Sequence, residues 1–140
     1  MIPDTDKAYI AGLFDGEGSV SYKQYMRKRS HNKKAYPTWQ IRLEIAMTDQ
    51  SLLMWLHEVL GVGSVIRRNV KGTTKSGRKY KTQWRWRCTF RDAYHVCKLL
   101  WPYTHVKLHK IEQVIDHYSP ITFEGNVVSL SDYRNYMGLE

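Results

Sequence analysis

A strict alternation of side-chain types over residues 80–90 constrains the fold of this chain more than any other feature of its sequence. Apolar or small side chains occupy every second position and polar or basic ones lie between them. The two sets are Tyr80, Thr82, Trp84, Trp86, Cys88 and Phe90, and Lys81, Gln83, Arg85, Arg87 and Thr89. A period of two predicts a half-buried β-strand with one face in a core. The other face presents donors for phosphates and base edges.

Three further segments predict strands of the same kind. Residues 39–45 repeat the alternation, and residues 19–27 follow it more weakly. Residues 65–71 are a fourth candidate, rich in Arg and Lys, whose register the sequence does not fix. Polar, basic connections over residues 25–37 and 71–79 predict two hairpins with long tips. The four strands therefore predict a sheet with one basic face.

Apolar spacing predicts four helices around these strands. Their expected ranges are residues 4–15, 49–60, 92–101 and 104–118. The expected N-caps are Asp4 or Thr5 for the first helix and Thr48 or Asp49 for the second, which Gly61 ends. The order predicts an α+β fold over residues 1–118, with helices on one side of an antiparallel sheet. The sequence does not place the C-terminal extension, residues 119–140.

The charge of the chain predicts a polyanionic partner. The 140 residues have the size of one domain and a net charge of +9, and residues 23–91 hold seventeen Lys and Arg against three acids. A solvated basic surface and attraction to anionic lipid are the alternatives, but basic side chains along strands favour nucleic acid. The expected DNA contacts are Ser21, Lys23, Tyr25, Arg27, Gln40, Arg42, Arg68, Lys81, Gln83, Arg85 and Arg87.

Composition excludes several other classes of protein. Cys88 and Cys97 are too few for a disulfide framework or a cysteine-based zinc site, and we expect both to be buried. No apolar stretch has the length of a membrane span, and the polar N-terminus does not resemble a signal peptide. We therefore expect a soluble intracellular protein with no membrane partner, cytoplasmic in a bacterial or phage host or organellar if organelle-encoded.

The most unusual local chemistry lies in the sequence YIAGLFDGEGS near the N-terminus. Gly12 inside a helix costs about 1 kcal/mol relative to Ala. Together with Ala11 and Gly16 it removes side chains from one face, which allows another helix to approach closely. Asp15 and Glu17 fall at the C-terminus of this helix, where the macrodipole disfavours negative charge. A hard divalent cation such as Mg²⁺ would compensate them, and two solvated acids beside a glycine helix stop are an equal alternative.

Residues 10–18 resemble the LAGLIDADG motif of homing endonucleases. The segment matches the motif at Ala11, Gly12, Leu13, Asp15 and Gly18, with Phe14 in place of Ile, Gly16 in place of Ala and Glu17 in place of the second Asp. The predicted order of elements is also similar to the αββαββα core of that family, over roughly residues 6–118. The resemblance implies a saddle-shaped antiparallel DNA-binding sheet with helices on its opposite face.

The resemblance further implies a site-specific homing endonuclease encoded by an intron or a freestanding mobile gene. Such an enzyme would make a double-strand break in a long pseudo-palindromic DNA target by phosphodiester hydrolysis that depends on Mg²⁺ or Mn²⁺. Family members with one motif are homodimers, in which the two motif helices pack together. The residues expected at that interface are Ala11, Gly12, Asp15, which would cap the partner helix, and Gly16.

The family's functional positions imply a candidate site. Glu17 is the expected metal-binding and catalytic acid, with the carbonyl of Gly16 as a second ligand. Lys107 would stabilise developing negative charge or position water. Asp49 would order solvent near the phosphate, or would only cap the second helix. Two binding functions are alternatives to the nuclease: an RNA-binding splicing maturase and a DNA-binding regulator that leaves its site intact. A general architectural DNA binder is a third and weaker one.

Overall fold

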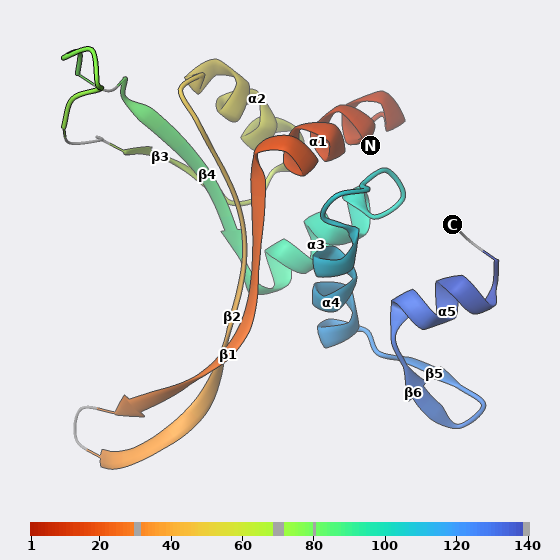
Figure 1. Cartoon of the computed structure of the whole chain (residues 1–140). Coiled ribbons are helices and arrows are strands. Elements are labelled where there is room, and N and C mark those ends of the chain that lie inside the picture. Colours follow the sequence, from red (N-terminus) through yellow and green to blue (C-terminus); the bar gives the residue numbers. More distant parts are fainter. Residues whose placement is uncertain (30–31, 69–71, 80, 139–140) are drawn as a thin grey trace.

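The computed structural model describes residues 1–29, 32–68, 72–79 and 81–138 (Figure 1). The elements in chain order are α1 (Asp4–Glu17), β1 (Gly18–Arg29), β2 (Asn32–Met47), α2 (Gln50–Leu60), β3 (Ser64–Arg68), β4 (Gln83–Thr89), α3 (Phe90–Leu100), α4 (Leu108–Tyr118), β5 (Ile121–Phe123), β6 (Asn126–Val128) and α5 (Leu130–Tyr136). The predicted α+β class and the order αββαββα are confirmed. No helix of the described residues is long and apolar enough to cross a membrane.

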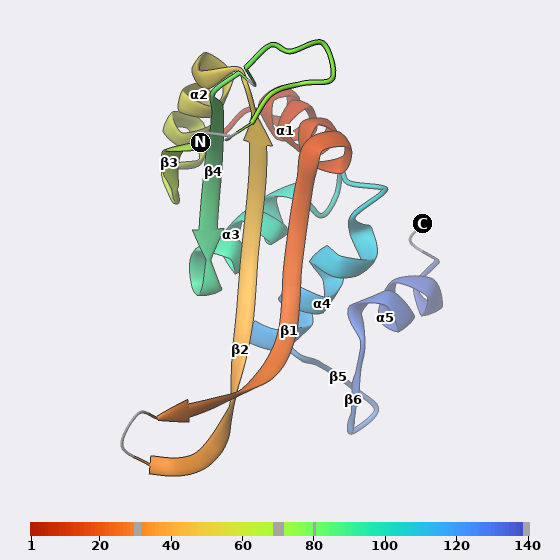
Figure 2. The same cartoon turned by 60° about the vertical axis from the view of Figure 1, so that its left-hand side comes forward.

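A four-stranded antiparallel sheet in the order β1-β2-β4-β3 forms the centre of the fold. Leu43 of β2 pairs with Val20 on one side and with Cys88 on the other, so these three side chains share the core face. Arg42, one residue earlier, pairs with Ser21 and points to the opposite face. The pairing confirms the alternation predicted from the sequence, and Figure 2 shows the open face of the sheet with the helices behind it.

The strands differ in length from the prediction. Residues 25–29 and 32–37, expected as a flexible connection, mostly continue β1 and β2, which pair beyond the end of β4 as a long two-stranded hairpin (Figures 1 and 2). In contrast, β3 ends at Arg68 and β4 begins only at Gln83. The predicted extensions of these strands over residues 69–71 and Tyr80 lie outside the described residues.

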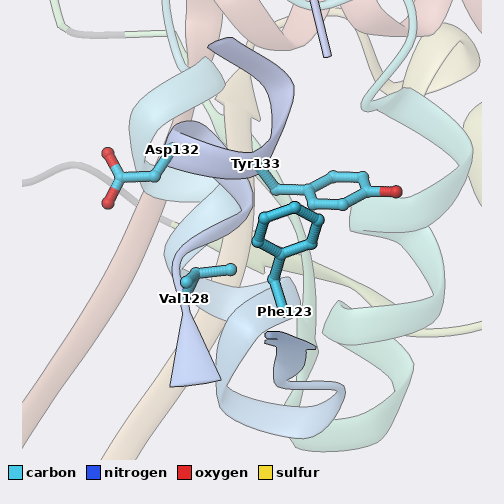
Figure 3. A pocket seen from close by; sticks show the side chains of 4 residues that line it. All are labelled: Phe123, Val128, Asp132 and Tyr133. Atoms are coloured by element: carbon cyan, nitrogen blue, oxygen red, sulfur yellow. The ribbon is translucent and has the colours of Figure 1, made fainter. Parts of the chain in front are cut away.

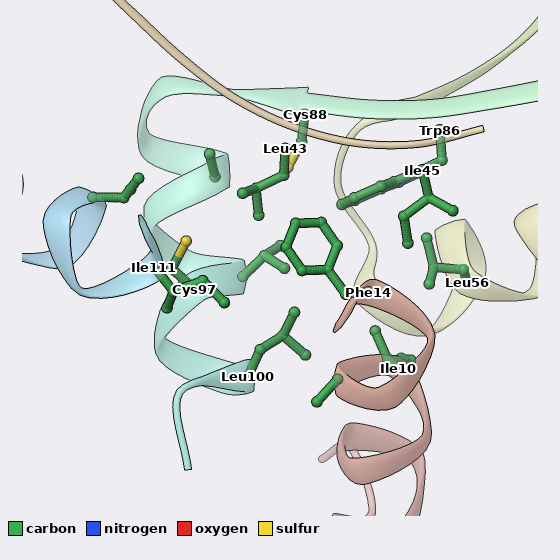
Figure 4. Packing of buried hydrophobic residues seen from close by; sticks show 14 of the residues in the cluster. Ile10, Phe14, Leu43, Ile45, Leu56, Trp86, Cys88, Cys97, Leu100 and Ile111 are labelled. Atoms are coloured by element: carbon green, nitrogen blue, oxygen red, sulfur yellow. The ribbon is translucent and has the colours of Figure 1, made fainter. Parts of the chain in front are cut away.

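Phe14 lies at the centre of the hydrophobic core between the sheet and the helices. It contributes to the core with Ile10, Leu43, Trp86 and Leu100, all almost fully buried (Figure 4). The Phe14 ring also explains why residue 18 of the motif is a glycine. A Cβ atom on Gly18 would lie 2.3 Å from Cδ2 of Phe14, so the chain can enter β1 at this point only without a side chain.

Helix ends agree with the prediction in part. Asp49 caps α2 by accepting a hydrogen bond of 3.0 Å from the backbone N–H of Leu52, and Gly61 ends the helix in the left-handed conformation, both as predicted. The expected cap of α1 by Asp4 or Thr5 is wrong, because Pro3 precedes that helix and no side chain caps it. Proline tolerates this place because the first N–H groups of a helix have no intrahelical acceptor.

The two later core helices also begin at other residues than predicted. α3 begins at Phe90 rather than Asp92, because the chain turns sharply there with a positive φ of 52°. α4 begins at Leu108 rather than Thr104. The residues before Leu108 bond to a carboxylate of α1 instead of forming a helical turn.

The C-terminal extension, which the sequence did not place, folds as a β5–β6 hairpin and the helix α5 beside α4 (Figure 1). Asp116 of α4 accepts hydrogen bonds of 2.9 and 3.0 Å from the backbone N–H of Leu130. Arg134 of α5 donates to the buried carboxylate of Glu112 at 3.0 Å, and Trp101 donates to the same group. A small, mostly apolar hollow of about 190 Å³ lies between the hairpin and α5 (Figure 3).

Candidate active site

The exposed carboxylate of Glu17 lies where the motif helix meets the sheet. Glu17 is the last residue of α1, and Gly18 begins β1 opposite Ile45. The helix has no residue four positions after Gly16, so the Gly16 carbonyl receives no i+4 hydrogen bond within α1. A carboxylate and a carbonyl therefore lie together at the C-terminal end of the helix, beside the first residues of the basic face.

The carboxylate of Asp15 ties α1 to the segment that precedes α4. Oδ1 accepts hydrogen bonds from the hydroxyl of Thr104 and from the backbone N–H of Lys107 at 3.1 Å, and Oδ2 accepts one from the backbone N–H of His105 at 2.8 Å. Thr104 is buried. The carboxylate that we expected to cap a partner helix thus has three donors in its own chain, and the capping of a partner helix stays a prediction.

These hydrogen bonds set the charge state of Asp15. Burial by itself would raise the pKa of its carboxyl group. The hydrogen bonds from Thr104 and from the backbone N–H groups of His105 and Lys107 favour the ionised form and outweigh burial, so the pKa lies below the ordinary 3.8. Asp15 is therefore ionised near neutral pH and accepts hydrogen bonds from all of these donors.

Lys107 immediately precedes α4, and its backbone is fixed to the same end of α1 that holds Glu17. Its side chain is partly exposed. The structure thus brings the regions of two predicted catalytic residues together through Asp15. Thr104 was missed as a site residue, because the sequence pattern placed it in the first turn of a helix and gave no sign of a bond to a residue 89 positions earlier.

The three small residues predicted at a dimer interface differ in exposure. Gly12 and Gly16 lie on the exposed face of α1, and a Cβ atom on either would meet nothing within 4 Å. Ala11 is fully buried in the hydrophobic core of its own chain. The prediction for Ala11 is therefore corrected: it has no surface left for a partner, whereas Gly12 and Gly16 leave the helix backbone open to one.

Asp49 has the structural role that the sequence offered as one of two possibilities. Asp49 lies on the turn that follows β2. One of its carboxylate oxygens accepts a hydrogen bond from the backbone N–H of Leu52 and so caps α2. The side chain is exposed. Its second proposed role, ordering solvent near a phosphate, stays a prediction.

The strand register places nearly all predicted DNA contacts on one face of the sheet. Ser21 pairs with Arg42, Lys23 with Gln40 and Arg68 with Gln83, so the side chains of each pair lie on the same face. Tyr25 and Arg27 lie an even number of residues from Lys23 on β1, and so share its face. Arg85 and Arg87 lie an even number of residues from Gln83 on β4, and so share its face too. This face is opposite to the buried one. Lys81 is exposed but precedes β4, so no strand fixes its direction. Glu44 lies on the same face, and its paired arginines give it a role that the sequence did not indicate.

The candidate metal site fits a hard divalent cation only as part of a larger site. Among the described residues no group of three or more His, Cys, Asp or Glu could hold a metal ion. Glu17 and the carbonyl of Gly16 are nevertheless the oxygen ligands that Mg²⁺ prefers. Mg²⁺ usually retains several waters and is bound by one or two carboxylates together with substrate phosphates. The residues present therefore fit Mg²⁺ at a contact with a phosphate backbone.

Sequence comparison identifies the family. The profile of the LAGLIDADG endonuclease family matches residues 10–83, more than half of the chain. The chain belongs to the LAGLIDADG endonuclease family. The matched region begins in the motif helix and continues through β1, β2, α2 and β3 to the start of β4. It therefore contains Glu17 and most of the basic face. No curated protein sequence matches the chain.

Solved structures of homing endonucleases share the fold. I-CvuI, solved with its target and Ca²⁺, superposes with a TM-score of 0.61 at 17% identity, over 81% of this chain and 65% of that one. The group I intron-encoded I-CeuI, complexed with DNA, gives 0.59 at 14% identity, over 82% and 54%. The archaeal intron-encoded I-Vdi141I, also complexed with DNA, gives 0.57 at 14% identity, over 81% and 66%. This LAGLIDADG chain thus spans less than two thirds of the length of these proteins.

Proposed function

We propose that this protein is a homodimeric, site-specific homing endonuclease that cuts both strands of a long pseudo-palindromic DNA target in the presence of Mg²⁺ or Mn²⁺. The observation that supports this proposal best is the position of Glu17. Its exposed carboxylate ends the motif helix at the point where the basic sheet begins. DNA bound along that sheet would therefore pass beside the candidate metal ligand.

The dimensions of the sheet suit a DNA duplex. β2 has 16 residues, which at about 3.3 Å per residue is roughly 50 Å, more than one helical turn of DNA. Two copies related by a two-fold axis would present two such sheets to two half-sites, as is usual for dimers that bind pseudo-palindromes. The exposed, side-chain-free backbone at Gly12 and Gly16 supports a close contact between the two motif helices at that axis.

The residues of the chain would divide the work of the reaction among them. Glu17, with the carbonyl of Gly16, would hold the divalent ion, which when bound supplies Lewis-acid activation of the phosphate and of water. The ammonium group of Lys107 would stabilise negative charge that develops on the phosphate oxygens. Asp15 would act as a positioning residue, because its hydrogen bonds fix the backbone from which Lys107 extends. Arg and Lys along the sheet would hold the DNA through its phosphates.

Repeated selection of bound duplexes from a randomised library, followed by a cleavage assay, tests this function. We expect the protein to enrich one long pseudo-palindrome, to bind it as two chains per duplex in sedimentation experiments, and to cut both strands in Mg²⁺ but not in EDTA. A selected duplex that stays intact in Mg²⁺ and Mn²⁺ would indicate a regulator instead. Preferential binding of a structured intron RNA in competition would indicate a maturase, and binding without sequence preference would indicate an architectural protein.

A further inference from the structure

One glutamate lies among three arginines on the basic face. Arg87 donates from both Nε and Nη2 to Oε2 of Glu44, at 3.2 and 3.0 Å. Nε of Arg42 lies 3.7 Å from the same oxygen, and Nε of Arg85 lies 3.6 Å from Oε1. The four side chains come from β2 and β4, and Glu44 pairs with Arg87 directly across the two strands. A single carboxylate therefore forms ion pairs with all three of these arginines.

This cluster is sheltered enough for its geometry to matter. The Glu44 side chain is 17% exposed and that of Arg87 is 28% exposed. Hydrogen bonds between ionised groups are stronger than neutral ones, and partial burial reduces their screening by salt. Nε of Arg85 is buried and makes no hydrogen bond within the described part of the chain. Glu44 thus restrains the arginine side chains, and the cluster as a whole keeps a net positive charge.

Two of the restrained arginines line a hollow of about 200 Å³ on the sheet face. Arg42 and Arg87 lie in its wall together with Gln40, Thr89 and Phe90. The Nε and Nη2 atoms of Arg87 face Glu44, but a guanidinium has five N–H donors, so others stay available to a ligand. Arginine donors match O6 and N7 of guanine in the major groove. The chemistry of the hollow therefore fits the edge of a guanine base.

We propose that Glu44 is a positioning residue for sequence recognition, which holds Arg42 and Arg87 at the wall of this hollow so that it accepts a guanine edge. The inference rests on the proposed DNA-binding function. An unrestrained arginine can swing to the nearest phosphate, a contact that adds affinity for any sequence. The carboxylate opposes that movement by bonding to the guanidinium and by repelling phosphates. Glu44 thereby lowers the affinity for DNA of any sequence and increases the discrimination between bases.

Selection from a randomised duplex library by the wild type and by two variants tests this role. Glu44→Gln keeps the shape of the side chain and removes its charge. Glu58→Gln removes one charge from an exposed acid on α2 and serves as the matched control. For Glu44→Gln we expect loss of a guanine preference at one position in each half-site and roughly 3- to 10-fold tighter binding to a non-specific duplex. The salt dependence of non-specific binding should steepen by about one phosphate contact or more per chain. Glu58→Gln should change none of these.

Arg87→Lys provides a second variant whose result does not depend on the folding of Glu44→Gln. Lysine keeps the positive charge but lacks the planar guanidinium group, which can donate two parallel hydrogen bonds to Glu44 or to guanine. We expect it to lose the same guanine preference. The role of Glu44 is overturned if Glu44→Gln, folded by its thermal transition, selects the same guanines as the wild type, or if Arg87→Lys does so. Failure of the wild type to enrich any duplex would instead overturn the proposed function itself.

Discussion

The carboxylate of Asp15 accepts a hydrogen bond of 3.1 Å from the backbone N–H of Lys107, across 92 residues of sequence. This bond fixes the start of α4 to the end of the motif helix. It connects the carboxylate at Glu17 with a lysine that the sequence pattern alone places on a distant helix.

We predict that Asp15→Asn destabilises the chain and displaces Lys107. An amide can accept through its oxygen, but its NH₂ group would face an N–H donor, which should cost about 1–3 kcal/mol of unfolding free energy. Displacement of the Lys107 backbone should lower the cleavage rate by roughly 10- to 100-fold with little change in DNA affinity. Urea unfolding and single-turnover cleavage measure the two effects.

The matched control for this variant is Asp49→Asn. Asn caps a helix as well as Asp does, so this change should leave stability nearly unaltered. If Asp15→Asn matches Asp49→Asn in stability and cleaves like the wild type, Asp15 does not position Lys107.

We predict that acid removes the stabilising contribution of Asp15. Its pKa is lower in the folded chain than the ordinary 3.8, so the unfolded chain takes up a proton first as the pH falls. The contribution is complete above that ordinary value and is lost as the pH falls through the folded pKa. The difference in unfolding free energy between the wild type and Asp15→Asn should therefore shrink in acid, as measured by urea unfolding from pH 6 to pH 2.5. A difference that stays constant over this range would show that the ionised carboxylate is not responsible.

We predict opposite effects of alanine at two glycines of the motif. Gly18→Ala should cost about 1–3 kcal/mol, because the new Cβ atom would overlap the ring of Phe14. Gly12→Ala should stabilise the isolated chain by about 1 kcal/mol, because nothing lies within 4 Å and Ala favours the helix. The same Gly12→Ala change should weaken dimerisation, since the methyl group would separate the two motif helices.

Unfolding at low protein concentration and sedimentation equilibrium measure these two quantities for the glycine variants. A Gly12→Ala chain that associates as tightly as the wild type would place the dimer contact elsewhere.

We predict that Arg134→Ala destabilises the packing of the C-terminal extension on α4. Glu112 is 2% exposed and, among the described residues, would keep only the indole N–H of Trp101 as a donor. Leaving a buried carboxylate without its cation should cost about 3 kcal/mol or somewhat more. Adding Glu112→Gln to this variant should recover part of the loss, because a neutral amide is cheaper to bury. Thermal unfolding of both variants measures the effect, and equal stability of the single and double variants would contradict it.

Period-two patterns predicted the sheet well because each strand is half-buried and alternates without interruption. Trp84, Trp86 and Cys88 face the helices, and Arg85 and Arg87 face outward, as the sequence indicated. Strand ends were predicted less well. Residues 25–29 and 32–37 pair mainly with each other, beyond the end of β4, so most of them are exposed and have little apolar pattern to reveal them.

Interactions between distant residues account for what the sequence did not predict. Thr104 and Asp15 meet only because α3 and the turn after it return the chain to α1. Glu44 was predicted to face outward, but its ion pairs with Arg85 and Arg87 depend on the pairing of β2 with β4. The docking of the C-terminal extension likewise depends on Glu112 and Asp116 of α4, whose donors Arg134 and Leu130 lie 22 and 14 residues later in the chain.

The most direct test of the proposed active site is cleavage of the selected duplex in Mg²⁺ by Glu17→Gln beside the wild type, with DNA binding measured on the same samples. The amide keeps the size of the side chain but loses the charge that a divalent cation requires. We predict that Glu17→Gln binds the duplex within about 3-fold of the wild type and cuts neither strand at a detectable rate. Cleavage by Glu17→Gln at the wild-type rate, in a preparation free of other nucleases, would contradict the assignment of Glu17.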